Sequence, residues 1–278
     1  MKDRRNTRQF CYTQQSLNAF ENCPLRFKKR YMEGLRWDSL PDEAAKASLE
    51  KGNSFHLLAC RYFSGIPYGL SENAKDFELL TRWMRSLENY FTLRPEAVYL
   101  PEHTLRAELD GLILEANFDL IILEDGRLNI WDWKTHGSKA ENSFMQTGDN
   151  LNSTRSRLEK SLQTMVYMYV LCEQANTLAV GSTKDSGTGY LSEAKGCDTL
   201  CMRYWQPEPP HILAEINYDA ATHEKFRLHL KALLKKICEY DFSEFDKSLY
   251  SKYCKRCEFN WYCNGLAAQD DQSAPADE

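Results

Sequence analysis

The chain has 278 residues, of which 42% are hydrophobic and 27% charged, and its formal net charge is −5. This length allows a sizeable core in one or two domains, and the composition is that of a soluble globular protein. No apolar run is long enough to span a bilayer, and no apolar signal core follows the N-terminal residues, so we expect a cytoplasmic protein. The negative charge counts mildly against a nucleic-acid binder, although a local basic patch can still bind phosphate.

Two short helices are predicted near the N-terminus. Thr13 can cap a helix that runs to Phe20. Cys23 and Pro24 interrupt it, and because proline is well tolerated in the first turn of a helix, a second helix can start there. Four cations make this second helix strongly basic, and they form either a solvated face or a contact for a nucleic-acid backbone: Arg26, Lys28, Lys29 and Arg30.

Two longer helices are predicted over residues 42–65 and 71–92. The first carries Gly52 four residues before His56, so the two share one face, and the glycine allows another backbone to approach closely. A lone helical histidine is more often a core or surface residue than a metal ligand. His56 can therefore be interpreted as a ligand only if other candidate ligands lie near it. The second helix carries an apolar stripe that we assign to the core.

A meander of strands is predicted next, over residues 98–100, 104–109, 112–123 and 128–133. The last two strands meet at Asp125-Gly126, a pair favoured in hairpin turns. Side chains i and i+2 of a strand share a face, so Asp132 and Lys134 point the same way, and the hairpin can bring Asp119 alongside. Burying two carboxylates and an ammonium group on one face is costly unless a ligand binds between them. A divalent metal ion with a phosphate would pair with all three side chains. A surface ion pair at a strand end is the alternative.

The second half of the chain is predicted to mix helices and short strands. Residues 136–157 are polar, and we expect a mobile loop that is either a lid over the site or a plain surface loop. A helix follows over residues 158–174, on which Gln163 and Tyr167 are four positions apart and share a face. Further strands and one long helix are expected at 178–180, 188–191, 200–205, 212–216 and 219–240.

The chain has ten cysteines, and in a reducing compartment we do not expect them to form a disulfide framework. Cys254, Cys257 and Cys263 fall within ten residues and can converge on one centre, which needs a fourth ligand. Cys23 is the best choice, because it precedes a proline at a helix break. Zinc and an iron–sulfur cluster both fit four thiolates, and the uneven division suits a cluster that joins the two ends of the chain. Three helical cysteines are interpreted as small apolar core residues: Cys60, Cys172 and Cys238.

Six segments, taken together and in order, resemble the RecB-like nucleases with an iron–sulfur cluster, which include AddB nuclease domains and CRISPR-associated RecB-like exonucleases. The resemblance spans residues 12–263. The segment from Tyr12 to Tyr31 resembles the N-terminal motif of the family. Its three catalytic motifs are matched, in order, by Gly52…His56, Asn117-Phe118-Asp119 and Asp132-Trp133-Lys134-Thr135. The Gln-x-x-x-Tyr helix is matched by Gln163…Tyr167, and the C-terminal cysteine triplet by Cys254, Cys257 and Cys263.

The resemblance implies an α/β fold of the PD-(D/E)XK type, with a mixed central sheet flanked by helices and with its N- and C-terminal segments joined by a 4Fe–4S cluster. It implies one nuclease domain over residues 1–268, including cluster-binding segments at 12–31 and 250–265. We expect a disordered acidic tail over residues 269–278. The implied activity is Mg²⁺- or Mn²⁺-dependent hydrolysis of DNA phosphodiester bonds, by an exonuclease that prefers single strands.

The resemblance also implies a role for each matched residue. The divalent metal would be held by His56, Asp119, Asp132 and the backbone carbonyl of Trp133. Lys134 would position or help to deprotonate the attacking water. The wall of the site or the substrate strand would be held by Gln163 and Tyr167. The cluster ligands would be Cys23, Cys254, Cys257 and Cys263.

The chain departs from the family pattern at three places, none of which removes a catalytic group. Ala116-Asn117 stand where the family usually has glycine, Gln15 replaces a serine or threonine, and the insertion over residues 136–157 is long. Two other functions stay open. The fold could serve as a non-catalytic platform for DNA ends or a protein partner, or the chain could be a zinc-stapled interaction protein.

The expected partners are DNA, as single strands or duplex ends, and a helicase or a CRISPR-adaptation protein. DNA repair and recombination, phage DNA processing and CRISPR spacer acquisition are all compatible with the residues.

Overall fold

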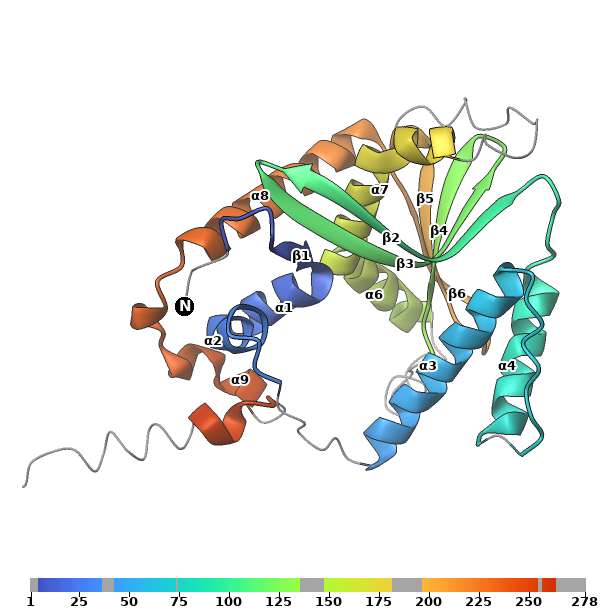
Figure 1. Cartoon of the computed structure of the whole chain (residues 1–278), viewed down its shortest axis with the longest axis horizontal. Coiled ribbons are helices and arrows are strands. Elements are labelled where there is room, and N and C mark those ends of the chain that lie inside the picture. Colours follow the sequence, from blue (N-terminus) through green and yellow to red (C-terminus); the bar gives the residue numbers. More distant parts are fainter. Residues whose placement is uncertain are drawn as a thin grey trace, which may run out of the picture.

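The computed structural model describes residues 5–36, 43–73, 75–135, 148–181, 197–254 and 257–263. A six-stranded mixed sheet forms its centre, in the order β1-β3-β4-β5-β6 (Figure 1). Strand β2 pairs along the whole of β3, whereas β1 and β4 pair with different halves of β3. The strands are β1 (Cys11–Thr13), β2 (Val98–Leu109), β3 (Leu112–Glu124), β4 (Arg127–Trp133), β5 (Leu200–Trp205) and β6 (Ile212–Asn217).

Two tight hairpins set the register of the central strands. The predicted turn at Asp125-Gly126 joins β3 to β4, with φ angles of 50° and 67°. The turn at Asp110-Gly111 joins β2 to β3 in the same way, with φ angles of 50° and 83°. Positive φ at both central residues matches the twist of the flanking strands. The strand predicted in two pieces, 98–100 and 104–109, is the single strand β2.

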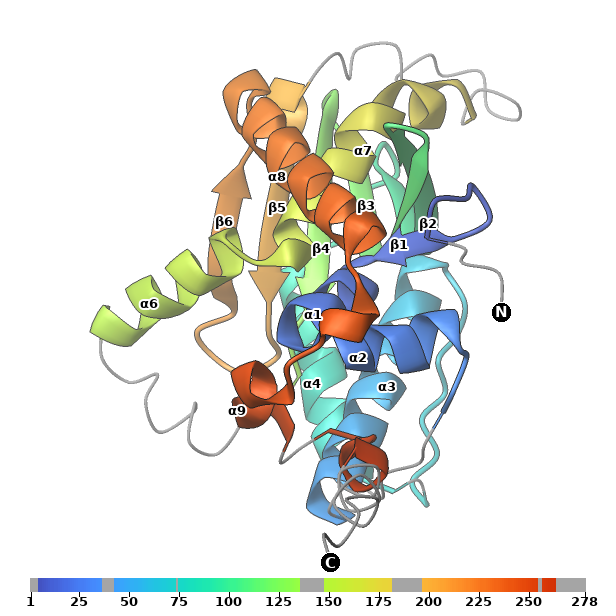
Figure 2. The ribbon, with the colours of Figure 1, turned by 90° about the vertical axis from the view of Figure 1, so that its left-hand side faces the viewer.

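Helices cover both faces of the sheet (Figures 1 and 2). Helices α3 (Glu43–Phe63) and α4 (Phe77–Tyr90) pack on one face, and α7 (Leu162–Gly181) and α8 (Ala220–Glu239) on the other. The remaining helices are short: α1 (Gln14–Asn22), α2 (Pro24–Phe27), the π-helix η1 (Lys28–Met32), α6 (Gly148–Glu159), η2 (Cys197–Thr199), η3 (Phe242–Glu244), η4 (Lys247–Tyr250) and α9 (Ser251–Cys254).

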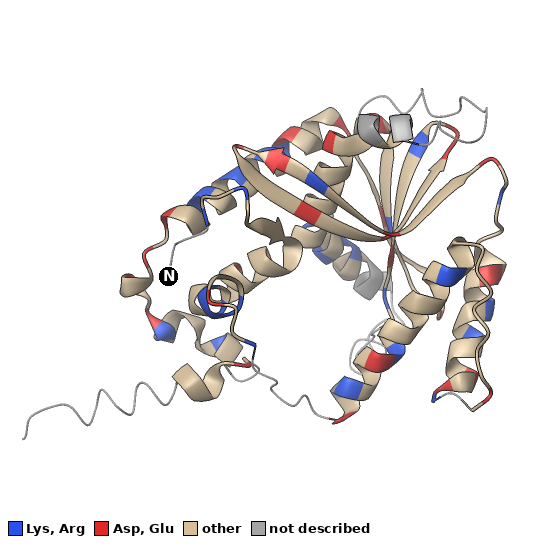
Figure 3. Ribbon diagram, viewed as in Figure 1, with Lys and Arg blue, Asp and Glu red and all other residues tan. Residues whose placement is uncertain are grey.

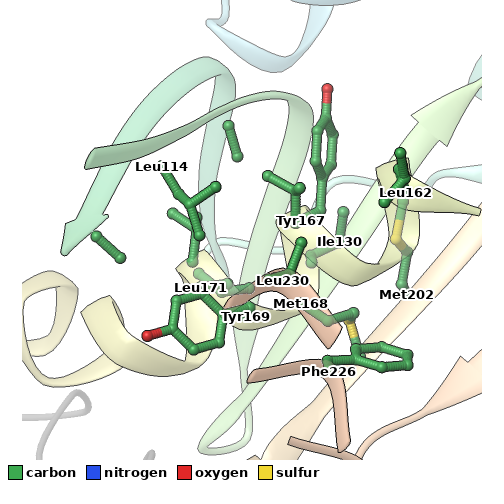
Figure 4. Packing of buried hydrophobic residues seen from close by; sticks show 14 of the residues in the cluster. Leu114, Ile130, Leu162, Tyr167, Met168, Tyr169, Leu171, Met202, Phe226 and Leu230 are labelled. Carbon is green, nitrogen blue, oxygen red and sulfur yellow. The ribbon is translucent and has the colours of Figure 1, made fainter. Parts of the chain in front are cut away.

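Each face of the sheet has its own core. On the α7 side, Leu114, Ile130 and Met202 of the sheet pack with Met168 of α7 and Leu230 of α8 (Figure 4). The α3 side is aromatic, and its rings lie within 6.4 Å of one another around Phe55, Trp133 and Trp205. Helix α7 lies between the sheet and α8, which explains why its sequence is apolar on more than one side.

Three predictions about the second half are wrong. Residues 178–180 are not a strand but continue α7, the helix whose residues up to Ala175 supply much of the core. The predicted loop over 136–157 contains helix α6 from Gly148, and its residues 136–147 lie outside the described chain. The predicted helix over 158–174 is divided between α6 and α7, with a break at Lys160 and Ser161.

Two further expectations, the strand at 188–191 and the tail from 269, fall on residues that are not described. Among the described helices, none is long and apolar enough to cross a membrane.

Candidate active site

Helix α3 and strand β3 bring the predicted metal ligands His56 and Asp119 together. The Nδ1 atom of His56 lies 3.3 Å from Oδ1 of Asp119. The other carboxylate oxygen of Asp119 accepts a hydrogen bond of 2.7 Å from the backbone N–H of Trp133 on β4. Asp119 therefore links α3 to the strand that carries Asp132 and leads to Lys134.

A further acidic group, Glu102 on β2, joins this cluster and is absent from the sequence-based prediction. Its Oε1 atom lies 3.7 Å from Nδ1 of His56, and ligand atoms of Glu102, His56 and Asp119 all lie within 4.8 Å of one another. Glu102 has a φ of 46°, a strained conformation for a residue other than glycine. The sequence does contain a signal for Glu102, which is the Asp110-Gly111 turn. A hairpin closed at this turn pairs β2 with β3 in a register that places Glu102 opposite Asp119.

A second group adjoins the first and consists of Asp132, Lys134 and Gln163. Oδ2 of Asp132 lies 2.6 Å from Nζ of Lys134 in an ion pair. The side-chain amide of Gln163 donates to Oδ1 of Asp132, and its Oε1 accepts a hydrogen bond of 3.0 Å from Lys134. Asp132 is only 3% exposed, so this closed triangle is what holds its charge inside the protein.

Burial and neighbouring charges shift the titration of both groups. Burial raises the pKa of Asp132 to about 6, with Lys134 opposing the rise and Asp119 adding to it. Burial lowers the pKa of His56, but hydrogen bonds to Asp119 and Glu102 outweigh it and raise the value to about 10. His56 therefore carries a proton at neutral pH that a bound metal ion would have to displace.

Two tyrosines form a wall of the site. The ring of Tyr167 on α7 packs against Phe118, with centroids 4.9 Å apart. Burial and the nearby carboxylates raise the pKa of Tyr167 above the ordinary range, so its hydroxyl stays protonated. Nζ of Lys134 lies 5.0 Å from the ring centre of Tyr204, and the Tyr204 hydroxyl is 2.7 Å from Oγ1 of Thr164.

The donors of the first group suit a hard divalent cation. Carboxylate oxygens are the ligands that Mg²⁺ prefers, and an imidazole nitrogen extends the choice to Mn²⁺. Oδ2 of Asp132 is buried and accepts no hydrogen bond of good geometry from the described residues, although it is paired with Lys134. A cation could therefore take the place of the Lys134 ammonium at this oxygen. The residues present fit such an ion, and ligation by the carbonyl of Trp133 stays a prediction.

The chain matches the family model described as PD-(D/E)XK nuclease superfamily over residues 12–264. The matched region contains every side chain of both groups. The chain belongs to the PD-(D/E)XK nuclease superfamily. Members of this superfamily are generally nucleases that act on DNA and typically use Mg²⁺ or Mn²⁺. No curated protein matches the chain.

The four cysteines predicted to hold a cluster in this PD-(D/E)XK chain come from its two ends. Cys23 lies between α1 and α2, and Cys254 ends α9. Burial raises the pKa of the Cys23 thiol, and Cys263 and Cys254 are close enough to raise it further. Among the described residues, no three of these sulfur atoms lie within 4.8 Å of one another, unlike the atoms of the His56 group. Their role as cluster ligands therefore stays a prediction.

The predicted DNA-binding cations contact the protein itself. Arg26 and Arg30 both bind Glu258, at 2.9 and 3.1 Å. Lys29 is buried, and its Nζ lies 3.7 Å from the ring centre of Tyr262. Lys28 lies 4.0 Å from Glu33 and 5.2 Å from the ring centre of Phe242. Arg26 of α2 and Lys29 and Arg30 of η1 therefore contact the C-terminal segment. Figure 3 shows basic residues in blue on these short helices, and their contact with DNA stays a prediction.

The interpretation of Cys172 as an apolar core thiol is wrong. It forms a disulfide with Cys197, and both residues are only partly buried. The bond was not predicted, because the argument from the sequence addressed only a disulfide framework and assigned Cys172 to the core from its helix position alone. An oxidised cysteine pair weighs against an iron–sulfur cluster in the same protein. Cys60 and Cys238 are free cysteines that are only partly buried.

Proposed function

We propose that this protein is a metal-dependent DNA nuclease. The single observation that carries the proposal is the meeting of His56, Asp119, Asp132 and Lys134 at the end of the β3–β4 hairpin, in a chain of this superfamily. These side chains supply an acidic cation site beside one ammonium group. That combination suits a phosphodiester, whose charge increases as water attacks it.

His56, Glu102, Asp119 and Asp132 would hold the metal ion. When bound, the ion lowers the pKa of water and neutralises charge on the phosphate. Lys134 would supply an ammonium group that orients the attacking water and stabilises developing negative charge on the phosphate. Because Lys134 is paired with Asp132 in the metal-free protein, cation binding to Asp132 would release the ammonium for this role.

Gln163 is a positioning residue in this proposal. It contacts both Asp132 and Lys134 and comes from a helix fixed between the sheet and α8. Tyr167 lies one turn further along the same helix and shares its face. Together they would keep the carboxylate and the ammonium apart at the correct spacing when the metal is bound, or hold the substrate strand.

The finer proposals rest on the resemblance of the motifs. We propose an exonuclease that prefers single-stranded DNA, works with a helicase or a CRISPR-adaptation protein, and acts in repair, recombination or foreign-DNA processing. We also propose that residues 1–268 form one domain, and we keep the cytoplasm as its expected location.

A 4Fe–4S cluster on Cys23, Cys254, Cys257 and Cys263 is also proposed. Its support is the spacing of these cysteines and the approach of the two chain ends, which the Arg26–Glu258 ion pair maintains. The disulfide at Cys172 weighs against it, and zinc on the same four thiolates is the alternative. Colour distinguishes them, because a cluster absorbs visible light and zinc does not.

The test of the function is degradation of end-labelled and circular DNA, as single and double strands, with Mn²⁺, with Mg²⁺ and with a chelator. We expect cleavage that the chelator abolishes and added metal restores. Circular DNA that is not cut would support an exonuclease. Specific binding of DNA ends without cleavage under any metal condition would favour the alternative, a non-catalytic binding module on this fold.

A further inference from the structure

A cluster of metal-binding groups lies outside the nuclease site. Cys172 on α7, Cys197 on η2 and His223 in the first turn of α8 each offer a ligand atom within 4.8 Å of the others. All three side chains are half-buried. Cys172 is nine positions from Gln163, about 13 Å along the axis of the same helix, so this cluster is separate from the nuclease site.

His223 is held in a fixed orientation by three neighbours. Its Nε2 atom lies 3.0 Å from Oε1 of Glu173, and its Nδ1 atom lies 3.2 Å from the hydroxyl of Tyr218. Its ring stacks on Tyr169, with centroids 5.2 Å apart and planes at 10°. In metal sites, a hydrogen bond on one ring nitrogen of a histidine orients the other nitrogen toward the ion. In His223 the bond to Tyr218 would orient Nδ1, and Nε2 would be the metal ligand.

We propose that, in the reduced protein, Cys172, Cys197 and His223 bind one zinc ion. Two thiolates and an imidazole are characteristic zinc donors, and they come here from three different elements. Glu173 is the nearest candidate for the fourth ligand. Its 3.0 Å separation from Nε2 of His223 is close to the ~3.3 Å expected between two ligands of one tetrahedral zinc ion. The Nδ1–H group of His223 would then donate a hydrogen bond to the hydroxyl oxygen of Tyr218.

The disulfide and the zinc site are two states of the same sulfur atoms. A phosphine reductant donates two electrons to the disulfide and takes its oxygen from water, which leaves two thiols and one phosphine oxide. Zinc then displaces one proton from each thiol. In both states Cys172 and Cys197 connect α7 to η2, the short helix before β5. The link is a disulfide in the oxidised protein and would be a zinc ion in the reduced protein.

The test is zinc content of the full chain after removal of metal, reduction with a phosphine and exposure to zinc under anaerobic conditions. All proteins carry Asp119→Ala, which weakens zinc binding at the nuclease site. Cys172→Ser and His223→Ala are compared with Cys201→Ser, a free buried cysteine on β5 outside the cluster. We expect each of the first two variants to lose one equivalent of zinc relative to the parent, and Cys201→Ser to lose none.

A second measurement uses cobalt in place of zinc, because cobalt bound to thiolate gives a charge-transfer absorption. We expect Cys172→Ser and Cys197→Ser to reduce this absorption while their circular dichroism stays that of the parent. Equal zinc content in the parent and in folded Cys172→Ser would overturn the proposal. So would a count of two freely reactive thiols at Cys172 and Cys197 in the zinc-saturated protein.

Discussion

Asp132 is the residue on which the site depends most, because its carboxylate is buried and is held by one ion pair and one hydrogen bond. Lys134 lies on one oxygen and Gln163 on the other. A salt bridge of this kind contributes little net stability, since desolvation offsets the attraction, but removing one partner leaves a buried charge. If Asp132 binds the proposed cation, that cation would replace the Lys134 ammonium and open this triangle.

Glu102 should contribute to metal affinity. We expect Glu102→Gln to weaken Mn²⁺ binding at least about tenfold, because it removes one anionic oxygen from the cation site. Glu108→Gln is a matched control on the same strand, since Glu108 pairs with Arg8 instead. Calorimetric titration with Mn²⁺ measures both. Equal affinities in the two variants would remove Glu102 from the site.

The protonation of His56 predicts a pH dependence of stability. Its pKa of about 10 in the folded, metal-free protein lies above its ordinary 6.5. The charged histidine therefore stabilises the fold fully below pH 6.5, and this contribution is lost as the pH rises through about 10. Thermal unfolding of metal-free wild type and His56→Gln should differ most near pH 6 and converge above pH 10. A difference that does not change with pH would contradict the raised pKa.

At the scale of elements, the two Asp-Gly turns decide the geometry of the site. One turn fixes the register of β2 on β3, which places Glu102 beside Asp119. The other fixes the register of β3 on β4, which places Asp132 beside Asp119. Gly126 has a φ of 67°, where an L-residue is strained. The hairpin therefore depends on this glycine.

We expect Gly126→Ala to lower the free energy of unfolding by about 1 kcal/mol. Asp125→Gly is the matched variant, because Asp125 also has a positive φ, of 50°, and glycine should be tolerated there. Urea denaturation of both variants gives the comparison. If Asp125→Gly lowered the free energy of unfolding more than Gly126→Ala, backbone strain at Gly126 would not be what determines the stability of the hairpin.

The elements also show which parts of the fold could be predicted. The hairpin around Asp125, the face shared by Asp132 and Lys134, and the proximity of Asp119 followed from period-two alternation and turn chemistry, which are local. Glu102 was missed because its role depends on pairing across β2 and β3. The strand predicted at 178–180 was wrong because a short apolar run cannot be told from the end of an apolar helix by periodicity alone. The pairing of Cys172 with Cys197 depends on tertiary proximity that spacing does not encode.

At the scale of the whole molecule, the C-terminal segment returns to the N-terminal helices. Figures 1 and 2 place α9 at the same end of the molecule as α1 and α2, and Glu258 joins Arg26 and Arg30. A cluster shared by Cys23 and Cys254 would close a loop of about 230 residues, worth about 5 kcal/mol by the relation for cross-links. The proposed cluster would thus act as a staple.

We expect Cys23→Ser to lose its iron and visible absorption and to unfold at lower temperature. Cys238→Ser is the matched control, because its thiol contacts Arg5 and Tyr12 and lies outside the proposed cluster. Iron content and absorption are measured on anaerobically purified protein. Full iron in Cys23→Ser would show that another residue is the fourth ligand, and zinc without iron in the wild type would show that the cluster assignment is wrong.

The most direct test of the nuclease assignment is the single-turnover rate of cleavage of labelled single-stranded DNA with Mn²⁺. We compare wild type with Asp132→Asn and Lys134→Met, and use circular dichroism to show that each variant is folded. We expect both variants to lose at least about a hundredfold in rate, because one loses a cation ligand and the other the ammonium beside the phosphate. Cleavage by either folded variant at the wild-type rate would contradict the assignment of this site.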